Sequence, residues 1–563
     1  MTALLTDNLP LLAGAPNGIK KLRELILELA VRGKLVPQDA NDEPASELLK
    51  RIAEEKARLV AEGKIKRSKL LVDINELDKP YELPAGWSWT TLPGAASYQI
   101  GKTPPTKESK FWDDSGQAWV SISDMEHYGE INDTSRKVSV LAQQNVFKYP
   151  PIPAGTLLMS FKLTVGKVSI LAVDAYHNEA IISLSPFCGV SKDYLFSFLP
   201  SIALGGQQKN ALMGNTLNSE SMAQLLIPIP PLAEQHRIVA KVDELMALCD
   251  RMEARQADAD SAHAQLVQAL LDSLTQARDA EDFAQSWQRL AEHFHTLFTT
   301  ESSIDALKQT LLQLAVMGKL VPQDSSDEPA SELLVRLTND RNDYAAIHKV
   351  AVAKPEPISG SDQSLSLPNG WAWARLCSMF RVITDGDHQP PPKSTDGIAF
   401  LTIGNVTKGY LDFSNCRFVP QDYFDRVAIY RRPETGDILY TVVGATYGRP
   451  IAVNSSRDFC VQRHIAILKS SKLISPAFAC YLLASPWIYE QATQSTTGTA
   501  QPTIPLKPLR NFLVMLPPLP EQHRIVAKVD QLMALCDQLK ARLNQARQVH
   551  EQLATALVEQ AVA

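Results

Sequence analysis

The sequence predicts an α+β fold in which two mixed α/β bodies are joined by long helices that form an intramolecular antiparallel coiled coil, with a pseudo-two-fold internal repeat. Three observations predict this fold. The chain of 563 residues repeats three of its segments at a nearly constant offset. One of these segments has apolar residues at heptad spacing in both copies. Between the repeats lie short β-type runs that glycine and proline turns interrupt.

The repeated segments are nearly identical, and an internal repeat decides the architecture before any local feature does. Residues 22–39 recur 285 positions later, residues 83–89 recur 284 positions later, and residues 230–250 recur 287 positions later with two differences. The bodies between them share only sparse similarities, such as residues 164–167 with residues 446–449. Conserved connections beside divergent bodies indicate that the connections meet one partner twice, while the bodies meet different targets.

The repeats also set the predicted domain boundaries. We expect an N-terminal helical region at 1–80, a first body at 81–232, a central helical region at 233–340, a linker at 341–366, a second body at 367–519 and a C-terminal coiled-coil helix at 520–563. The central region combines a long helix with a copy of the N-terminal helices. The linker is predicted from its content of Lys, Ala, Pro, Ser and Gly.

The long helices are predicted from a seam of apolar residues that step by four and three. In the first copy the seam is Ile238, Val242, Leu245, Cys249, Met252, Ala259, Leu266 and Leu270. In the second copy it is Ile525, Val529, Leu532, Cys536, Leu539, Leu543, Ala546, Leu553 and Leu557. A helix of about 40 residues spans about 60 Å. Two such stripes are expected to pack against each other, with both cysteines as buried apolar residues rather than reactive thiols.

The bodies are expected to be rich in strands with short helices between them. Residues 118–122 and 400–403 have the β-type composition of strands. Residues 194–199 and 477–483 are expected to form short helices.

Composition and charge exclude several classes of protein. Seven scattered cysteines without a Cys-x-x-Cys pair argue against a disulfide framework and a structural zinc site. No run approaches the roughly 18 apolar residues of a membrane helix, and the first residues lack a secretory signal, so we expect a cytoplasmic protein. The net charge is −6, made up of −2 on the first body, +5 on the second (counted over 365–519) and −9 on the remainder. This distribution permits nucleic-acid binding by one basic face.

Motifs for catalysis are absent from the sequence. The chain has no Walker-type phosphate loop, no Gly-x-Gly-x-x-Gly after a strand and no Asn/Asp-Pro-Pro-Tyr/Phe motif. The Glu-Gln-His triplets at 234–236 and 521–523 stand at predicted helix starts, where an acidic residue complements the helix dipole. Helix capping is therefore expected there rather than metal binding, and we expect no catalytic site and no metal site.

The motifs together resemble the specificity (S) subunits of type I restriction–modification enzymes. The resemblance is carried by Leu-Pro-x-Gly-Trp, by residues 101–104, 119–125 and 154–160, and by Pro-Pro-Leu-x-Glu-Gln, and it extends over essentially the whole chain. It implies that each body is a target-recognition domain that reads one half of a bipartite double-stranded DNA site. The helices are implied to set the spacer and to dock two methyltransferase (M) subunits. The helices before Leu83, which some members lack, resemble residues 300–340 and are expected to add a docking surface.

The resemblance also implies the partners and cofactors. The M subunits of the family bind S-adenosylmethionine and methylate adenine at N6, after flipping the base out of the helix. The restriction (R) subunits use ATP and Mg for translocation and cleavage. This chain is implied to bind no cofactor and to be a non-catalytic DNA-recognition subunit.

Candidate DNA-binding residues are expected in polar loops, because phosphate contacts give affinity and side chains at base edges give specificity. In the first body they are Lys102, Thr103, Lys107, Ser123, Lys162, Thr164 and Lys167. In the second body they are His388, Lys393, Asn405, Thr446, Tyr447, Arg449, Thr496 and Gln501.

Two other functions remain open at this point. The first is a duplicated coiled-coil scaffold whose bodies bind proteins rather than DNA, which salt-sensitive DNA binding would contradict. The second is a nuclease or methyltransferase with an unrecognised site, which would be contradicted by a purified chain that is inert without M.

Overall fold

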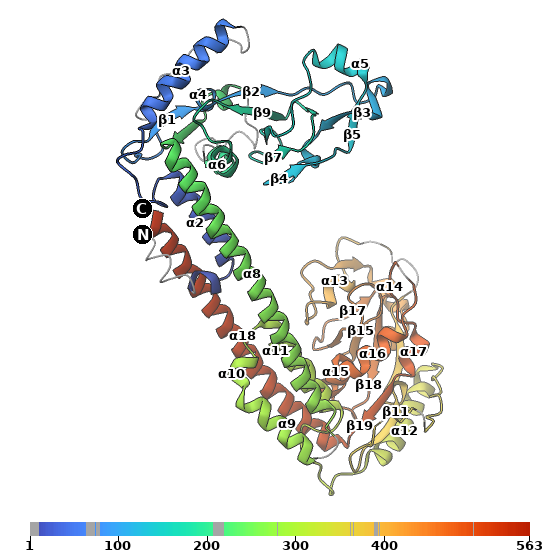
Figure 1. Ribbon diagram of the computed structural model, residues 1–563. Coiled ribbons are helices and arrows are strands. Elements are labelled where there is room, and N and C mark those ends of the chain that lie inside the picture. Colours follow the sequence, from blue (N-terminus) through green and yellow to red (C-terminus); the bar gives the residue numbers. More distant parts are fainter. Residues whose placement is uncertain are drawn as a thin grey trace. The chain divides into compact units, whose positions relative to one another are not determined.

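The computed structural model forms two compact units. It describes residues 11–62, 74, 79–205, 219–277, 280–360, 362–363, 365–387, 392, 394–498 and 500–562. Unit 1 contains residues 1–258 and 547–563, and unit 2 contains residues 259–546. Two 44-residue helices, α8 (Leu232–Thr275) and α18 (Leu519–Val562), each contribute residues to both units (Figure 1).

Body one, in unit 1, consists of two sheets above a two-stranded base. The first sheet has the order β2 (Ala96–Ile100), β9 (Ile181–Pro186), β6 (Leu157–Ser160), β7 (Val168–Leu171) and β4 (Gly129–Ile131). The second has the order β5 (Arg136–Val138), β3 (Trp112–Val120) and β8 (Tyr176–His177). At the base, β1 (Ser88–Thr91) pairs antiparallel with β10 (Leu226–Ile229), so the chain enters and leaves the body on adjacent strands.

Body two, in unit 2, repeats this strand order, except that its first sheet has four described strands and no counterpart of β4. Its first sheet has the order β12 (Phe380–Asp385), β18 (Ile465–Ser470), β15 (Ile438–Thr441) and β16 (Pro450–Ala452). Its second has the order β14 (Arg417–Val419), β13 (Ile398–Leu401) and β17 (Phe459–Val461), and its base pairs β11 (Ala372–Arg375) with β19 (Leu513–Leu516). The predicted α+β fold with a duplicated body is confirmed, since corresponding strands occupy corresponding places although their sequences differ.

The short helices of the bodies are confirmed and the two strands are partly so. Helices α6 (Lys192–Gly205) and α15 (Pro476–Ala484) contain the two predicted helical segments. Strand β3 ends at Val120 and β13 ends at Leu401, two residues before the predicted ends. In both bodies the chain turns there into a single helical turn that a side chain caps.

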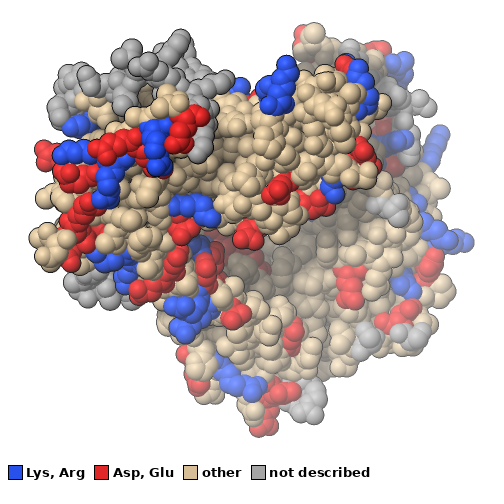
Figure 2. Space-filling model, turned by 45° about the horizontal axis from the view of Figure 1, so that its top comes forward, with Lys and Arg blue, Asp and Glu red and all other residues tan. Residues whose placement is uncertain are grey.

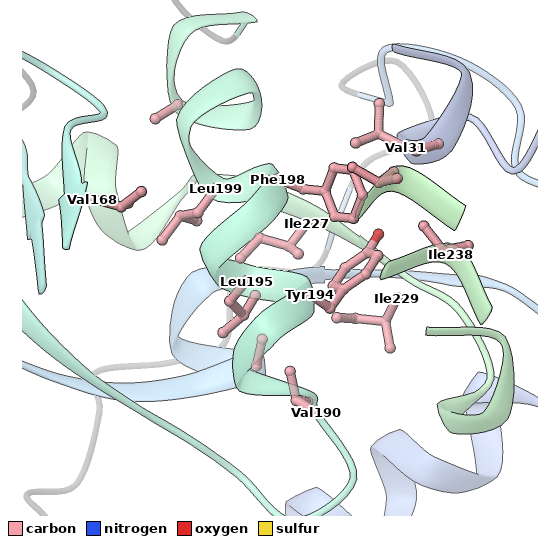
Figure 3. Packing of buried hydrophobic residues seen from close by; sticks show 14 of the residues in the cluster. Val31, Val168, Val190, Tyr194, Leu195, Phe198, Leu199, Ile227, Ile229 and Ile238 are labelled. Atoms are coloured by element: carbon pink, nitrogen blue, oxygen red, sulfur yellow. The ribbon is translucent and has the colours of Figure 1, made fainter. Parts of the chain in front are cut away.

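Helix α6 anchors body one to the helical part of unit 1. Tyr194 and Phe198 are fully buried and face Ile227 of β10 and Ile238 of α8 (Figure 3). The hydroxyl of Tyr194 donates a hydrogen bond of 2.9 Å to the carbonyl oxygen of Pro228, so its one buried polar group is satisfied. Body and helices therefore share one continuous hydrophobic core in unit 1.

The helical regions repeat as predicted. In unit 1, α2 (Gly18–Val31) is followed by α3 (Ala45–Ala61), and in unit 2, α11 (Glu301–Val316) is followed by α12 (Ala330–His348). Unit 2 also contains α9 (Ala280–Glu292) and α10 (Phe294–Leu297) ahead of α11.

The predicted linker at 341–366 is only partly correct. Its first residues belong to α12, which continues to His348, because Tyr344 is buried against the body. Its later residues bind Arg375 of body two. The Arg375 guanidinium donates hydrogen bonds to the carbonyl oxygens of Glu356 and Pro357 and forms an ion pair with Asp362 at 2.9 Å. The described part of this segment is therefore bound to body two.

The long helices pack as an antiparallel pair, and in each unit a third helix packs on this pair. The unit 1 core contains Cys249 of α8 and Ala554 of α18 together with α2, and the unit 2 core contains Leu271 of α8 and Cys536 of α18 together with α11. Ion pairs reinforce the third helix, as between Arg23 of α2 and α8. Both cysteines are buried, as predicted.

The predicted heptad seam is correct at its start and wrong by one residue farther along. Leu266 and Leu553 are 53% and 50% exposed, whereas Val267 and Ala554 are 3% and 0% exposed. A straight α-helix drifts by about 20° per heptad against a strict 3.5-residue repeat. Over the four heptads from Ile238 to Leu266 this drift reaches about 80°, nearly the rotation of one residue, so the buried face passes to the next position.

Each body is joined to its long helix by the same four side chains, which we call the junction clasp: Gln38, Trp87, Glu234 and Gln235 in unit 1, and Gln323, Trp371, Glu521 and Gln522 in unit 2. The indole nitrogen donates to one carboxylate oxygen at 3.0 Å in both units. The amide of the first glutamine donates to the other oxygen at 3.2 and 3.1 Å. The predicted capping role of the two glutamates is therefore incomplete, since both are 1% exposed and bind distant residues.

The second glutamine of each clasp is fully buried and connects three segments. In unit 1 the carbonyl of Gln235 accepts the backbone N–H of Ser191 at 2.7 Å, and its amide donates to the carbonyl oxygen of Pro230 at 3.0 Å. In unit 2, Gln522 makes the same contacts with Ser475 and Pro517. The identical residues of the repeat therefore hold each body on its helix.

A glycine makes room for each clasp. Gly33 has a φ of 66° and ends α2, and a Cβ atom there would lie 2.4 Å from Pro84 and 3.1 Å from Trp87. Gly318 stands in the same relation to Pro368 and Trp371. The Gly-Lys-Leu-Val-Pro-Gln segment is thus identical in both copies because its turn packs against the clasp tryptophan.

Among the described residues no group of three or more His, Cys, Asp or Glu side chains is placed to hold a metal ion. None of the described helices has the length and hydropathy needed to span a membrane.

Candidate nucleic-acid interface

In body one, four loops meet at one edge of the sheets: residues 101–108, 121–127, 161–167 and 177–180, here called loop edge one. Backbone hydrogen bonds join them, from Lys102 N–H to the His177 carbonyl at 2.9 Å and from Phe161 N–H to the Ala180 carbonyl at 2.9 Å. The ammonium of Lys167 reaches the carbonyl of Ile122 at 3.4 Å. Backbone groups thus make two of these three connections, which leaves exposed side chains at the loop tips available to a ligand.

In body two the corresponding loops are residues 386–387, 402–407, 442–449 and 462–464, joined by 495–498 and 500–503, here called loop edge two. The N–H of Val442 donates to the His464 carbonyl at 3.1 Å, as its counterpart does in body one. The guanidinium of Arg449 donates to the carbonyl of Thr407 at 2.9 Å. The same framework thus presents a different set of side chains.

A capping box shapes the second loop of each edge. Ser121 and Asp124 cap the single turn after β3, and Thr402 and Asn405 cap α13 (Ile403–Val406) after β13. Asn405 is 5% exposed, accepts from the backbone and hydroxyl of Thr402 and donates to the carbonyl of Asp412 at 3.0 Å. Its amide is engaged within the chain, so Asn405 has a structural role, and its contact with DNA stays a prediction.

A hydroxyl holds the hairpin between the two central strands in each body. The backbone N–H of Lys167 donates to Ser160 Oγ at 3.1 Å, and that of Arg449 donates to Thr441 Oγ1 at 3.0 Å. The hairpin of body two is one residue longer between these anchors. Thr446 and Tyr447 lie on that longer hairpin, and the ring of Tyr447 stacks on Tyr489 at 5.6 Å.

The structure brings the other candidates of body one onto loop edge one. Lys107, Ser123 and Thr164 are exposed, and no described partner of the Lys107 ammonium is found. Lys162 lies over the ring of Phe161 at 5.3 Å. Lys102 is exposed and donates to the carbonyl of Val146 at 3.1 Å, whereas the Thr103 hydroxyl donates to Glu179.

In body two, Arg449 and Gln501 are exposed on loop edge two, and Thr446, Tyr447 and Thr496 are partly buried there. The Thr496 hydroxyl donates to the carbonyl of Thr493 at 2.8 Å. His388 and Lys393 lie outside the described residues. The described candidates thus share one edge in each body, and their contact with DNA stays a prediction.

Histidines at the loop edges have lowered pKa values. Burial lowers the pKa of His177 to about 4 and also lowers that of His127, to which the charge of Lys167 contributes. Burial and the charge of Arg463 lower the pKa of His464. The lowered pKa values favour the neutral form of all three side chains. His127 and His464 reach the surface and add hydrogen-bonding groups there, whereas His177 is 1% exposed.

The turn between the last two strands carries residues that the sequence analysis missed. In body one it contains Asn178 and Glu179, and in body two it contains Gln462, Arg463 and His464. Arg463 is exposed, and its described side-chain contact is with His464 at 3.4 Å. The offset of 284 that relates Glu179 to Arg463 was the available signal, since it reveals a reversal of charge at one loop position.

On the face shown in Figure 2, basic side chains are interspersed with acidic ones. Any attraction to phosphate is consequently local to the loops, in keeping with screening over about 8–10 Å at physiological salt.

Three comparisons place the chain among known proteins. The family described as "Type I restriction modification DNA specificity domain" matches residues 84–259 and 392–547. The type I restriction enzyme EcoAI specificity subunit of Escherichia coli is 37% identical over 97% of this chain and 94% of its own length. The EcoEI specificity subunit of the same species is 36% identical with the same coverage. A chain in a solved type I restriction–modification system is 20% identical over 86% of this chain and 99% of its own length, with a TM-score of 0.46.

Proposed function

The chain belongs to the family of type I restriction–modification DNA specificity subunits, and from this premise we propose that it selects the DNA site of such a system. Body one reads one half of a bipartite double-stranded site through loop edge one, and body two reads the other half through loop edge two. The observation that carries this proposal is one framework built twice with different side chains at its loop tips. Such a design reads two unlike sequences.

The chemistry of the loop edges suits this division of work. Exposed cations such as Lys102, Lys107 and Arg449 contact phosphates and supply affinity. Neutral groups such as Ser123 and Gln501 offer hydrogen bonds to base edges and supply specificity. The neutral His127 and His464 serve the second purpose, whereas His177 is buried within the body.

The duplicated helices serve the partners. We infer that the repeated helices α2 and α11, with α8 and α18, dock two M subunits, because the same residues occur in both units. The helices also set the unread spacer between the half-sites. S-adenosylmethionine is then bound by M, and ATP and Mg by R, while this chain binds no cofactor and acts as a non-catalytic subunit.

A scaffold that binds proteins through both bodies is less well supported. The match of both bodies to a DNA specificity domain favours DNA. The reversal from Glu179 to Arg463 also fits two readers of different sequences better than two copies of one protein-binding surface.

The test is a genome-wide map of N6-methyladenine in cells that express this chain with its M subunit. We expect one motif of two unlike half-sites separated by a fixed spacer. Replacing residues 367–516 with the second body of the EcoAI relative should change one half-site and leave the other unchanged. An active, bound M subunit without any motif that depends on this chain would refute the proposal.

A further inference from the structure

Leu163, at the tip of the hairpin between β6 and β7, violates two local rules at once. Its side chain is 80% exposed although it is apolar. Its φ is 65°, a left-handed conformation that branched side chains rarely adopt. The N–H of Thr164 donates to the carbonyl of Lys162 at 2.8 Å across it, which makes a three-residue γ-turn of the strained kind.

The matching hairpin of body two shows that this strain is avoidable. Both hairpins are anchored by a hydroxyl at the end of the preceding strand, on Ser160 and on Thr441. In body two the left-handed position is Gly444, with a φ of 87°, and glycine adopts it without steric cost. Body one keeps a leucine at such a position. A residue that stands against backbone preference and is exposed to water indicates a function for its side chain.

The surroundings of Leu163 indicate what the side chain meets. Residues 161–167 carry two lysines and no carboxylate. The Lys162 ammonium lies against the ring of Phe161, and the described structure shows it no acidic partner. Thr164 is exposed beside it. An apolar tip flanked by cations matches duplex DNA, in which apolar base faces lie between two phosphate backbones.

We propose that Leu163 is an apolar wedge that inserts between base pairs of the half-site read by body one and opens that base step. The inference rests on the proposed function and deepens it. The γ-turn already presents the Leu163 side chain to solvent at the hairpin tip, so less conformational freedom is lost on binding. Lys162 and Lys167 hold the flanking phosphates while the step opens.

The test compares Leu163→Ala and Leu163→Gly in the complex of this chain with its M subunits. The probe is a duplex with the mapped site, in which 2-aminopurine replaces one base at a time in the first half-site. With the unaltered chain, fluorescence should rise at one step besides the target adenine, which M is expected to flip out of the helix. Both variants should abolish that rise and weaken binding about tenfold or more. Leu163→Gly should also raise the thermal midpoint of the free chain, because glycine relieves the left-handed strain.

Val140→Ala is the matched control, since Val140 is 65% exposed in the same body but lies on α5 (Val140–Ala142), outside the hairpin of Leu163 and the other loops of loop edge one. It should leave binding and fluorescence unchanged. Wild-type binding and fluorescence in both Leu163 variants would overturn the wedge. Loss of the M subunits from these variants on gel filtration would also overturn it, because Leu163 would then act in assembly of the complex. A third outcome would also overturn the wedge. If the unaltered chain gives no fluorescence rise, and replacing one thymine of the duplex by uracil weakens its binding as much as the Leu163 variants do, then Leu163 contacts a thymine methyl group instead.

Failure of the proposed function gives a different result. In that case the unaltered complex would not prefer the split site over a scrambled duplex. A complex that prefers the site, and whose Leu163 variants behave as the wild type, contradicts the wedge alone.

Discussion

The junction clasps and the loop edges are built on opposite principles. In each clasp the polar side-chain atoms bind the chain itself, as when Glu234 accepts from both Trp87 and Gln38. At the loop edges backbone hydrogen bonds make part of the connections and side chains such as Lys167 and Arg449 add others, while side chains such as Arg463 stay exposed. The clasps are therefore identical in both units, whereas the loop edges differ. The contacts of the clasp side chains fix the sequence there, whereas the exposed side chains at the loop tips are free to change.

Removing a clasp tryptophan tests this contrast most severely. Trp371→Ala should lower the free energy of unfolding by about 3–5 kcal/mol, because a buried indole is lost and Glu521 loses a hydrogen-bond donor. Urea denaturation followed by circular dichroism measures the loss. Trp287→Ala, at a residue that is 38% exposed on α9, should cost much less. Equal losses for the two variants would contradict the role of the clasp.

Glu521→Gln should have a smaller effect that depends on pH. Burial raises the pKa of Glu521, which outweighs the hydrogen bonds from Gln323 and Trp371. A group whose pKa is raised on folding contributes stability that is fully present below its unfolded pKa of about 4.5 and is lost as the pH rises through the folded pKa.

The glutamine variant should therefore lose more stability, relative to the wild type, near pH 4.5 than at pH 8. The difference between the two proteins in thermal midpoint across this range measures the effect. A constant difference would show that Glu521 keeps its ordinary pKa in the folded chain. Glu234→Gln should behave in the same way, since burial also raises the pKa of Glu234.

Arg463→Glu should leave stability within about 0.5 kcal/mol, because the side chain is exposed. Under the proposed function it should weaken binding about 10–100-fold, the range expected for losing one good base contact. Methylation mapping should show relaxed or altered recognition in the second half-site alone. An altered first half-site would mean that the two bodies do not read independently.

Lys107→Ala should have the smallest effect. The side chain is exposed on loop edge one, so it should weaken binding about twofold to threefold for every sequence and reduce the slope of log affinity against log salt by about 0.9. The test is to measure binding at salt concentrations from about 50 to about 200 mM, over which this slope is determined. Lys192→Ala is the control, since Lys192 contacts the carbonyl of Gly155 before β6, away from the loops.

The sequence predicted features that depend on repetition and local pattern. The duplicated bodies, the long helices and the buried Cys249 and Cys536 all followed from offsets and spacing. The error at Leu266 arose because a spacing rule was continued unchanged over four heptads, in which a straight helix drifts by almost one residue. The third helices that pack on the long pair could not be predicted either, because the heptad pattern of the long helices does not show which other helices contact them.

The clasp and the loop edges were harder to predict because their contacts are distant in sequence. Glu234 looked like a local cap, since its partner Trp87 is 147 residues away. Asn405 looked like a free polar side chain, although its place three residues after Thr402 is a capping-box spacing. A role for Leu163 was not predicted, because the sequence shows neither the exposure nor the φ of an apolar residue in a loop.

The division of unit 1 along the chain has a consequence for synthesis on the ribosome. Unit 2 is continuous, but the core of unit 1 joins Leu25 of α2 to Ala554 of α18. Roughly 500 residues separate them, which takes about half a minute to two minutes at 5–20 residues per second. During that time one side of the nascent N-terminal helix lacks its native cover. Folding of unit 1 therefore finishes after unit 2, and chaperones have their longest opportunity at α2.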